Sequence, residues 1–135
     1  MKRSEELLTE KQVWVVLGVN PVPDKFANRI FRKLKEHGKT VYGVNPLYDR
    51  LNGEKVYAHF TELPEKVDVV VSVVNPIIGL DYVAQIHTAE VPILWLQPGT
   101  VSDDLLKLAN EHSIEVIQDC VLVSYDLLDA KLRNK

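Results

Sequence analysis

Cysteine, net charge and long apolar runs are all scarce in this sequence. The single cysteine, Cys120, excludes an internal disulfide framework. A net charge of -3 at pH 7 gives no electrostatic footprint for nucleic acid or an anionic membrane surface, so neither is expected as a partner. No stretch approaches the roughly 20 apolar residues of a membrane span, and the first residues lack the apolar core of a signal peptide. These absences favour a cytoplasmic protein.

The composition is that of an ordinary globular protein. The chain has 135 residues, of which 46% are hydrophobic and 26% charged. This length is enough to bury a real core and too short for two comfortable domains. We therefore expect a single domain over residues 1–135, with its core at about 10–125.

Short apolar runs alternate with amphipathic segments along the chain. The apolar runs predict strands over 13–18, 40–44, 67–74, 92–97 and 114–119. Helical spacing of apolar residues predicts helices over 24–38, 76–88, 103–113 and 124–135, and a short one over 4–10. Strands that are apolar throughout are buried on both faces and are typical of a parallel sheet with helical crossovers. The pattern predicts a single doubly wound (Rossmann-like) α/β domain with a five-stranded parallel sheet flanked by helices.

Helix ends carry recognisable signals. Asp24, Asn75 and Ser102 are predicted N-caps, and Gly38 a C′ residue. The segment 47–64 is polar and is expected to be irregular, with a tight turn at Asn52-Gly53.

Amide side chains and prolines recur where the predicted strands end. In doubly wound sheets ligands bind beyond the carboxyl ends of the strands. Four of the five strand ends pair an amide with a proline; they contain Asn20-Pro21, Asn45-Pro46, Asn75-Pro76 and Gln97-Pro98. Asn-Pro also simply ends strands and starts turns, so the pattern fits either a strand stop or contacts to a polar, anionic ligand.

The first turn and the second strand end depart from a dinucleotide-binding fingerprint. Of the G-x-G-x-x-G glycines only Gly18 is present, although the following helix N-terminus still favours an anion, with Lys25 and Arg29 in its first turns. Asn45 stands where an acidic residue would bind the ribose 2′-hydroxyl of NAD. NAD is therefore disfavoured, and a nucleotide with a phosphorylated ribose is favoured, because a carboxylate would repel the added phosphate.

Taken in order, these motifs resemble a known family. The matching segments are Gly18-Val19-Asn20, Val44-Asn45-Pro46, the loop containing Gly53 and Val56-Tyr57, Trp95-Leu96-Gln97-Pro98-Gly99, and Asp119-Cys120. Over roughly residues 10–125 the chain resembles the small stand-alone CoA-binding proteins. These are similar to the N-terminal CoA-binding domain of the succinyl-CoA synthetase α subunit.

The resemblance implies a Rossmann-like domain that holds coenzyme A across the strand ends. By that analogy Gly18, Val19 and Asn20 meet the phosphates with Lys25 and Asn28 close by, Asn45 and Pro46 lie beside the ribose, Val74, Asn75 and Pro76 flank the adenine, and Gln97, Pro98 and Gly99 flank the pantetheine. Two features depart from the family. Its members often have Gly-Ala-Ser in the first turn and Asp-Arg-Cys near the end, whereas this chain has Val19-Asn20 and no arginine between Asp119 and Cys120.

The sequence contains no obvious catalytic apparatus. Three of its histidines, His37, His87 and His112, fall near predicted helix ends, where the helix dipole explains them, and no His/Cys spacing resembles a metal site. Cys120 is either a small buried residue or a thiol placed to pair with the CoA thiol.

We therefore expect a non-enzymatic protein that binds CoA or acyl-CoA as a carrier, sensor or regulatory module, with a protein partner left open. The alternatives are an NAD(P)-binding oxidoreductase-like domain, a component of a CoA-dependent enzyme, and a scaffold that has lost ligand binding.

Overall fold

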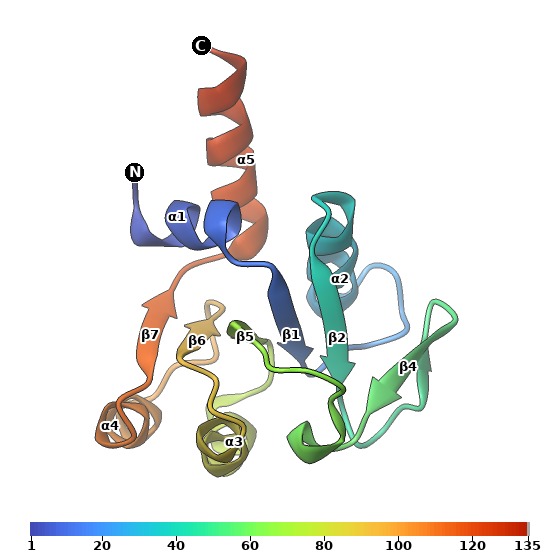
Figure 1. The fold of residues 1–135 in the computed structure, drawn as a ribbon, viewed down its shortest axis with the longest axis vertical. Coiled ribbons are helices and arrows are strands. Elements are labelled where there is room, and N and C mark those ends of the chain that lie inside the picture. The colour runs from blue at the N-terminus through green and yellow to red at the C-terminus, as the bar shows by residue number, and fades with distance from the viewer. Residues whose placement is uncertain (135) are drawn as a thin grey trace.

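The computed structural model describes residues 1–134 and shows one sheet between two layers of helices (Figure 1). The strands are β1 (Val13–Leu17), β2 (Thr40–Val44), β3 (Arg50–Leu51), β4 (Glu54–Tyr57), β5 (Val69–Ser72), β6 (Ile93–Leu96) and β7 (Glu115–Gln118). The helices are α1 (Arg3–Glu10), α2 (Phe26–Glu36), the 3₁₀ turn η1 (Phe60–Glu62), α3 (Pro76–Thr88), α4 (Asp103–Glu111) and α5 (Val121–Arg133). Lys135, the end of the predicted last helix, lies outside the described residues.

The sheet has the strand order of a Rossmann fold. Across the sheet the order is β3-β4-β2-β1-β5-β6-β7, and every pair is parallel except β3 with β4. Ranked along the chain, the six parallel strands therefore read 3-2-1-4-5-6, the order of doubly wound dinucleotide-binding domains. The strand order reverses between β1 and β5, so the loops after these two strands flank the expected ligand crevice.

The single α/β domain is confirmed, but the prediction of five strands is wrong, because the sheet has seven and is mixed. The two missed strands, β3 and β4, form a hairpin inside the segment expected to be irregular. Its turn is the predicted Asn52-Gly53, whose φ angles of 50° and 83° match the type I′ turn that hairpins prefer. The arms hold few apolar residues, and β4 joins the sheet through only two residue pairs with β2. Segments this short and polar lack the apolar run that predicts a buried strand.

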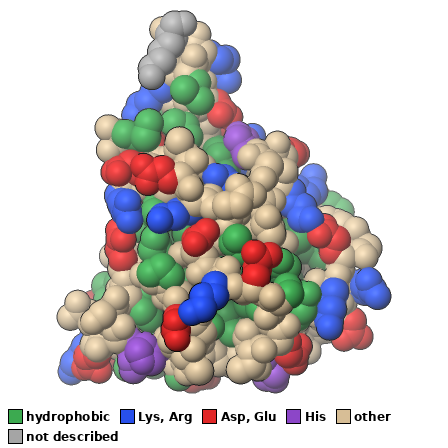
Figure 2. Space-filling model, in the orientation of Figure 1, with side chains coloured by type: hydrophobic (Ala, Val, Ile, Leu, Met, Phe, Trp, Pro, Cys, Tyr) green, Lys and Arg blue, Asp and Glu red, His purple; other side chains and the backbone are tan. Residues whose placement is uncertain are grey.

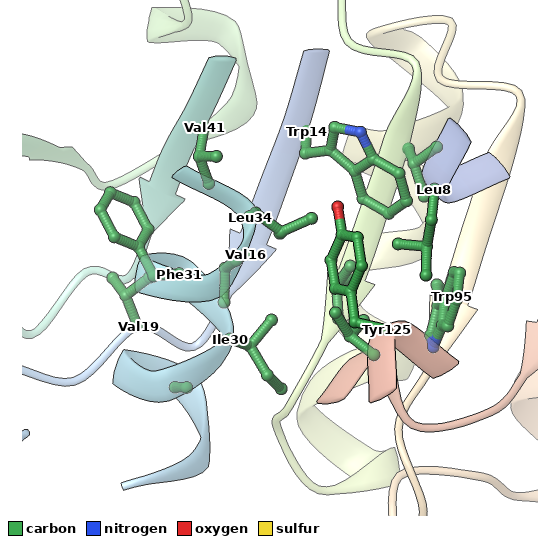
Figure 3. Close-up of a cluster of buried hydrophobic side chains, with 14 of the residues drawn as sticks. Leu8, Trp14, Val16, Val19, Ile30, Phe31, Leu34, Val41, Trp95 and Tyr125 are labelled. Carbon is green, nitrogen blue, oxygen red and sulfur yellow. The ribbon is translucent and has the colours of Figure 1, made fainter. Parts of the chain in front are cut away.

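Each face of the sheet has its own core. On one side, α1, α2 and α5 cover side chains such as Trp14 and Trp95, whose ring centroids lie 6.0 Å apart. Figure 3 shows Tyr125 of α5 reaching into this layer beside Ile30 and Leu34 of α2. On the other side, α3 and α4 cover an aliphatic layer of alternate strand residues (Figure 1). Burial on both faces explains the continuous apolar runs.

Most predicted helix ends are confirmed. The Asn75 side chain accepts hydrogen bonds from two backbone N–H groups of α3, and Pro76 occupies the first helical position. Ser102 caps α4. Gly38, at φ 79°, ends α2, and the N–H of Lys39 bonds back to the Leu34 carbonyl in a Schellman motif.

Two helix starts differ from the prediction. Asp24 is not the N-cap of α2, because a turn closed by the Lys25 N–H and the Val22 carbonyl occupies this stretch, and the helix begins at Phe26. Helix α5 begins at Val121 rather than at 124, directly after β7, because a distant side chain satisfies its first N–H. Among residues 1–134, no helix combines the length and apolar character needed to cross a membrane.

Candidate functional site

The carboxyl ends of the parallel strands form a rim with two hollowed regions. The first, called here the β1–β2 hollow, has a volume of about 320 Å³ and is lined by Leu17, Gly18, Val44, Asn45, Pro46, Leu47, Val74, Ile78 and Tyr82. It lies at the point where the strand order reverses. The sheet topology therefore predicts a ligand crevice where the structure has a cavity.

The β1–β2 hollow is neutral and largely apolar. None of its nine lining residues is acidic or basic. Val74 and Ile78 supply aliphatic walls and Tyr82 an aromatic one, and burial raises the pKa of the Tyr82 hydroxyl above its ordinary value. A cavity of this kind suits a flat, uncharged ring system better than a charged group.

Both polar atoms of the Asn45 side chain form hydrogen bonds within the protein. Its Nδ2 donates to the Val19 carbonyl at 2.9 Å, and its Oδ1 accepts the Leu47 N–H at 2.9 Å. These bonds tie the end of β2 to the turn after β1. Asn45 thus shapes the hollow as a strand stop and as a clamp between two loops.

The first turn is fixed by two further amides. Asn20 Oδ1 accepts the N–H of Val22, closing a local turn, while Asn28 Nδ2 donates to the Asn20 carbonyl at 2.8 Å. Asn28 is fully buried, and its Oδ1 accepts from Arg32 Nε at 2.9 Å. The turn that precedes the α2 N-terminus is therefore held in one shape by the fold.

Gly18 is required by close packing. With φ at 95°, a Cβ on this residue would lie 2.6 Å from Val74 Cγ1. The loops after β1 and β5 approach each other so closely that no side chain fits between them. Gly43 is similar, because its Cβ would lie 2.8 Å from a methyl group of Val19.

The second region, called here the thiol hollow, consists of two cavities that share Pro98 and Cys120. One has a volume of about 170 Å³ and is lined by Phe26, Val73, Gln97, Pro98, Thr100 and Cys120. The other has a volume of about 330 Å³ and is lined by Leu96, Pro98, Val101, Gln118, Asp119, Cys120 and Val123. Both lie beyond the ends of β6 and β7.

Gln97 links the thiol hollow to α5. This side chain is 5% exposed, and its Oε1 accepts the Val121 N–H, the first of α5, at 2.8 Å. The Gln97 carbonyl accepts the N–H and the hydroxyl of Thr100, which fixes the loop after β6. Gln97 lines the smaller cavity, and no described residue accepts a hydrogen bond from its Nε2.

The structure brings together some of the predicted site residues and not others. Gly18, Asn45, Pro46 and Val74 line the β1–β2 hollow, whereas Gln97 and Pro98 line the thiol hollow. The remaining predicted residues line neither region: Val19 and Asn28 are buried, Asn20 and Gly99 lie on loops at the rim, Lys25 and Asn75 are the N-cap residues of α2 and α3, and Pro76 is the first residue of α3.

Sequence reasoning missed several lining residues, chiefly Ile78 and Tyr82 of α3. A usable signal existed, since these two residues lie one helical turn apart just after the strand end at Val74. On the face seen in Figure 2, acidic and basic side chains are interspersed.

The strand order and the hollowed rim define a Rossmann-like α/β domain. Within this class, the family model described as "CoA binding domain" matches residues 12–126. The chain belongs to this family.

Individual relatives support the same placement. A hypothetical protein from Pyrococcus horikoshii OT3 superimposes with a TM-score of 0.88 and 30% identity, covering 93% of this chain and 89% of that one. An uncharacterized protein of Bacillus subtilis is 25% identical over 123 residues, 90% of each chain. The ADP-forming acetate–CoA ligase I of Archaeoglobus fulgidus is 36% identical over 69 residues, which are 51% of this chain and only 10% of the ligase.

Proposed function

We propose that the protein binds coenzyme A or an acyl-CoA along the carboxyl-end rim and acts without catalysis, as a carrier, sensor or regulatory module. Family membership supports the ligand class. The observation that carries the proposal is the neutral β1–β2 hollow, with Asn45 where an NAD site would hold a carboxylate. Such a hollow accepts the base, and it places no carboxylate next to a phosphorylated ribose at its edge.

The ligand would extend across the rim from one hollow to the other. The adenine would pack between Val74, Ile78 and Tyr82. The diphosphate would meet the N–H groups of the first turn and of the α2 N-terminus, near Lys25. The pantetheine arm would pass Gln97 toward Cys120.

The positions of the histidines support the non-catalytic part of the proposal. His37 stacks on Tyr125 with ring centroids 3.9 Å apart, and His87 contacts His112 at 4.3 Å, at the ends of α3 and α4. None of the three lines either hollow, and neither does His59. The residues that line the two hollows include no imidazole, and their one carboxylate, that of Asp119, accepts the Cys120 N–H through Oδ1.

Calorimetric titration of the reduced protein with CoA, dephospho-CoA, NAD and NADP tests the proposal. We expect CoA to bind at least about tenfold more tightly than NAD, a difference of about 1.4 kcal/mol. Preferential binding of NADP would favour the oxidoreductase-like alternative. A folded protein that binds none of the four at millimolar concentration would contradict the proposal.

Two neighbouring residues of α3 provide a matched pair of variants. Ile78 lines the β1–β2 hollow, whereas Ile77 is 77% exposed and does not. Ile78→Asp should lower the affinity for CoA about tenfold or more, because it places a carboxylate beside an anionic ligand. Ile77→Asp should leave the affinity within about twofold. Equal losses would place the binding site elsewhere.

Turnover separates a binding module from a component of a CoA-dependent enzyme. Similarity to the acetate–CoA ligase suggests which kind of enzyme component to test, although the match covers only a small part of that ligase. Incubation with acetyl-CoA and longer acyl-CoAs should release no free CoA above the rate without protein. Release that is lost in a histidine variant would instead show catalysis.

A further inference from the structure

We propose that the larger cavity of the thiol hollow holds an acyl group, and that the protein selects the CoA thioester of a neutral aliphatic acid over free CoA and over thioesters of dicarboxylic acids. The inference rests on the proposed function, because it needs the pantetheine arm on the rim. It deepens that function by naming the class of ligand.

The first support is the way the two cavities of the thiol hollow meet. Pro98 and Cys120 line both of them. The smaller cavity, of about 170 Å³, also contains Phe26, the first residue of α2, and so extends toward the helix N-terminus at which the diphosphate would bind. The larger cavity, of about 330 Å³, contains no residue of α2 or of the first turn. An arm that fills the smaller cavity therefore directs whatever its sulfur carries into the larger one.

The span of the rim is consistent with this order. From β1 there are two strand spacings to β6 and three to β7, or about 10 and 14 Å at the usual separation of neighbouring strands. An extended pantetheine arm that begins at the first turn covers this distance. Its sulfur then lies at the ends of β6 and β7, where the larger cavity is.

The second support is the apolar wall of the larger cavity. Leu96 is buried, and Val101 and Val123 add aliphatic side chains. Val123, in the first turn of α5, is 52% exposed, so an acyl chain placed against it would remove apolar surface from water on both partners. A methylene group is similar in size to a water molecule, which takes about 30 Å³ in the liquid. The cavity therefore has room for a short or medium chain.

The third support is the charge of the thiol hollow. Among the described residues that line its two cavities, Asp119 is the only charged one, and none is lysine, arginine or histidine. Arg29 lies over the Phe26 ring, 5.3 Å from its centroid, but lines neither cavity. An acyl group that ends in a carboxylate would thus face a like charge without a cation to offset it. A neutral acyl group has no such penalty.

Calorimetric titration of the reduced protein with CoA, acetyl-CoA, isovaleryl-CoA and malonyl-CoA tests the inference. Isovaleryl and malonyl groups have nearly the same shape, but malonyl carries a carboxylate in place of an isopropyl group. Full burial of a methylene raises affinity about fourfold. Because Val123 leaves the cavity partly open, we expect about twofold for each added carbon, or about eightfold from acetyl-CoA to isovaleryl-CoA. Malonyl-CoA should bind at least about tenfold more weakly than isovaleryl-CoA.

Two residues of α5 provide a matched pair of variants for the acyl site. Val123 lines the larger cavity, whereas Leu127, one turn further along and 48% exposed, lines neither cavity. In Val123→Asp the ratio of isovaleryl-CoA to acetyl-CoA affinity should fall toward one. In Leu127→Asp it should stay within about twofold of the wild-type ratio. Each ratio is measured within one variant, so a change in overall stability does not affect it.

Asp119→Asn tests the charge selectivity. The asparagine keeps an oxygen that can accept the Cys120 N–H, but removes the negative charge. The preference for isovaleryl-CoA over malonyl-CoA should shrink about threefold or more. Asp126→Asn, an exposed position of α5 outside the thiol hollow, is the control and should leave that preference unchanged.

The series separates failure of this inference from failure of the proposed function. Equal affinities for CoA, acetyl-CoA and isovaleryl-CoA would overturn the acyl site while leaving CoA binding intact. Equal effects of the two α5 variants, or of the two aspartate variants, would likewise place the acyl group elsewhere. A folded protein that binds none of the four compounds would contradict the proposed function itself.

Discussion

The β1–β2 hollow and the thiol hollow use their polar groups differently. At the ends of β1 and β2, Asn45 gives both its donor and its acceptor to neighbouring backbone. At the ends of β6 and β7, Gln97 gives the fold only its oxygen, and Cys120 borders two cavities. In the proposed complex, the first region would therefore recognise the ligand mainly by shape, whereas the second would offer groups with which the ligand can bond.

The largest effect is expected from a substitution at Gly18, where the loops beside the β1–β2 hollow pack most closely. Gly18→Ala places a Cβ against Val74 at a φ of 95°, so both the backbone conformation and the packing are strained. We expect a loss of about 3 kcal/mol in the free energy of unfolding, together with loss of CoA binding, measured by urea denaturation and calorimetry.

Gly38→Ala is the control for backbone strain alone. Gly38 also has a positive φ, 79°, but a Cβ added there would meet no other atom within 4 Å. This variant should lose only about 1 kcal/mol and retain CoA binding. Equal losses for the two glycine variants would show that the approach of Gly18 to Val74 is unimportant.

A smaller loss is expected when the clamp at Asn45 is altered. Asn45→Asp removes the donor to the Val19 carbonyl and places a carboxylate oxygen next to it. We expect a loss of about 1 to 2 kcal/mol in unfolding free energy. Because a carboxylate also repels a phosphorylated ribose, CoA affinity should fall more than dephospho-CoA affinity in calorimetry. Equal affinity losses would leave Asn45 with a structural role only.

In the thiol hollow, Gln97→Glu distinguishes the role of the amide oxygen Oε1 from that of the amide nitrogen Nε2. A glutamate keeps an oxygen that can accept the Val121 N–H, but replaces the unused donor Nε2 with a second oxygen. CoA affinity should fall about fivefold, or about 1 kcal/mol, while α5 stays capped. Unchanged affinity in calorimetry would show that Nε2 does not contact the ligand.

The smallest effect is expected far from both hollows, where Lys131 of α5 donates to both carboxylate oxygens of Glu5, at 2.9 and 2.8 Å. These bonds lower the pKa of Glu5 below its ordinary value of 4.5. Because the folded-state pKa is the lower one, the stabilisation is present above pH 4.5 and is lost as the pH falls through the folded-state value. Glu5→Gln should therefore lower the Tm at pH 7 by a few degrees and have less effect at pH 3. Glu10→Gln, at the exposed end of α1, is the control and should lower the Tm at neither pH.

The sequence was informative about the fold where burial is complete. Strands such as β1 and β6 are apolar on both faces, and that pattern is unambiguous. The β3–β4 hairpin was missed because two short polar arms carry no such pattern, although the Asn52-Gly53 turn between them was recognised. From the sequence, a parallel doubly wound sheet could be inferred, but not the order of its strands. That order depends on which strands pair, and the pairing strands lie far apart along the chain.

The rim could be located from the sequence, but the tasks of its residues could not. Topology alone placed Asn45 and Gln97 at strand ends. Their partners, Val19 and Val121, lie 26 and 24 residues away along the chain, and no local pattern records such contacts. For Asn75 the local pattern was sufficient, because its hydrogen bonds lie within the first turn of α3.

The hydrogen bond between Gln97 and Val121 also provides a way to observe, without a labelled ligand, whether the thiol hollow is occupied. The Val121 amide is sealed by a side chain and can exchange with deuterium only when that side chain turns away. A ligand that engages Gln97 Nε2 would hold the amide in place and slow exchange at this one position. The exchange rate of this one backbone amide would then report whether the pantetheine arm is bound, without any label on CoA.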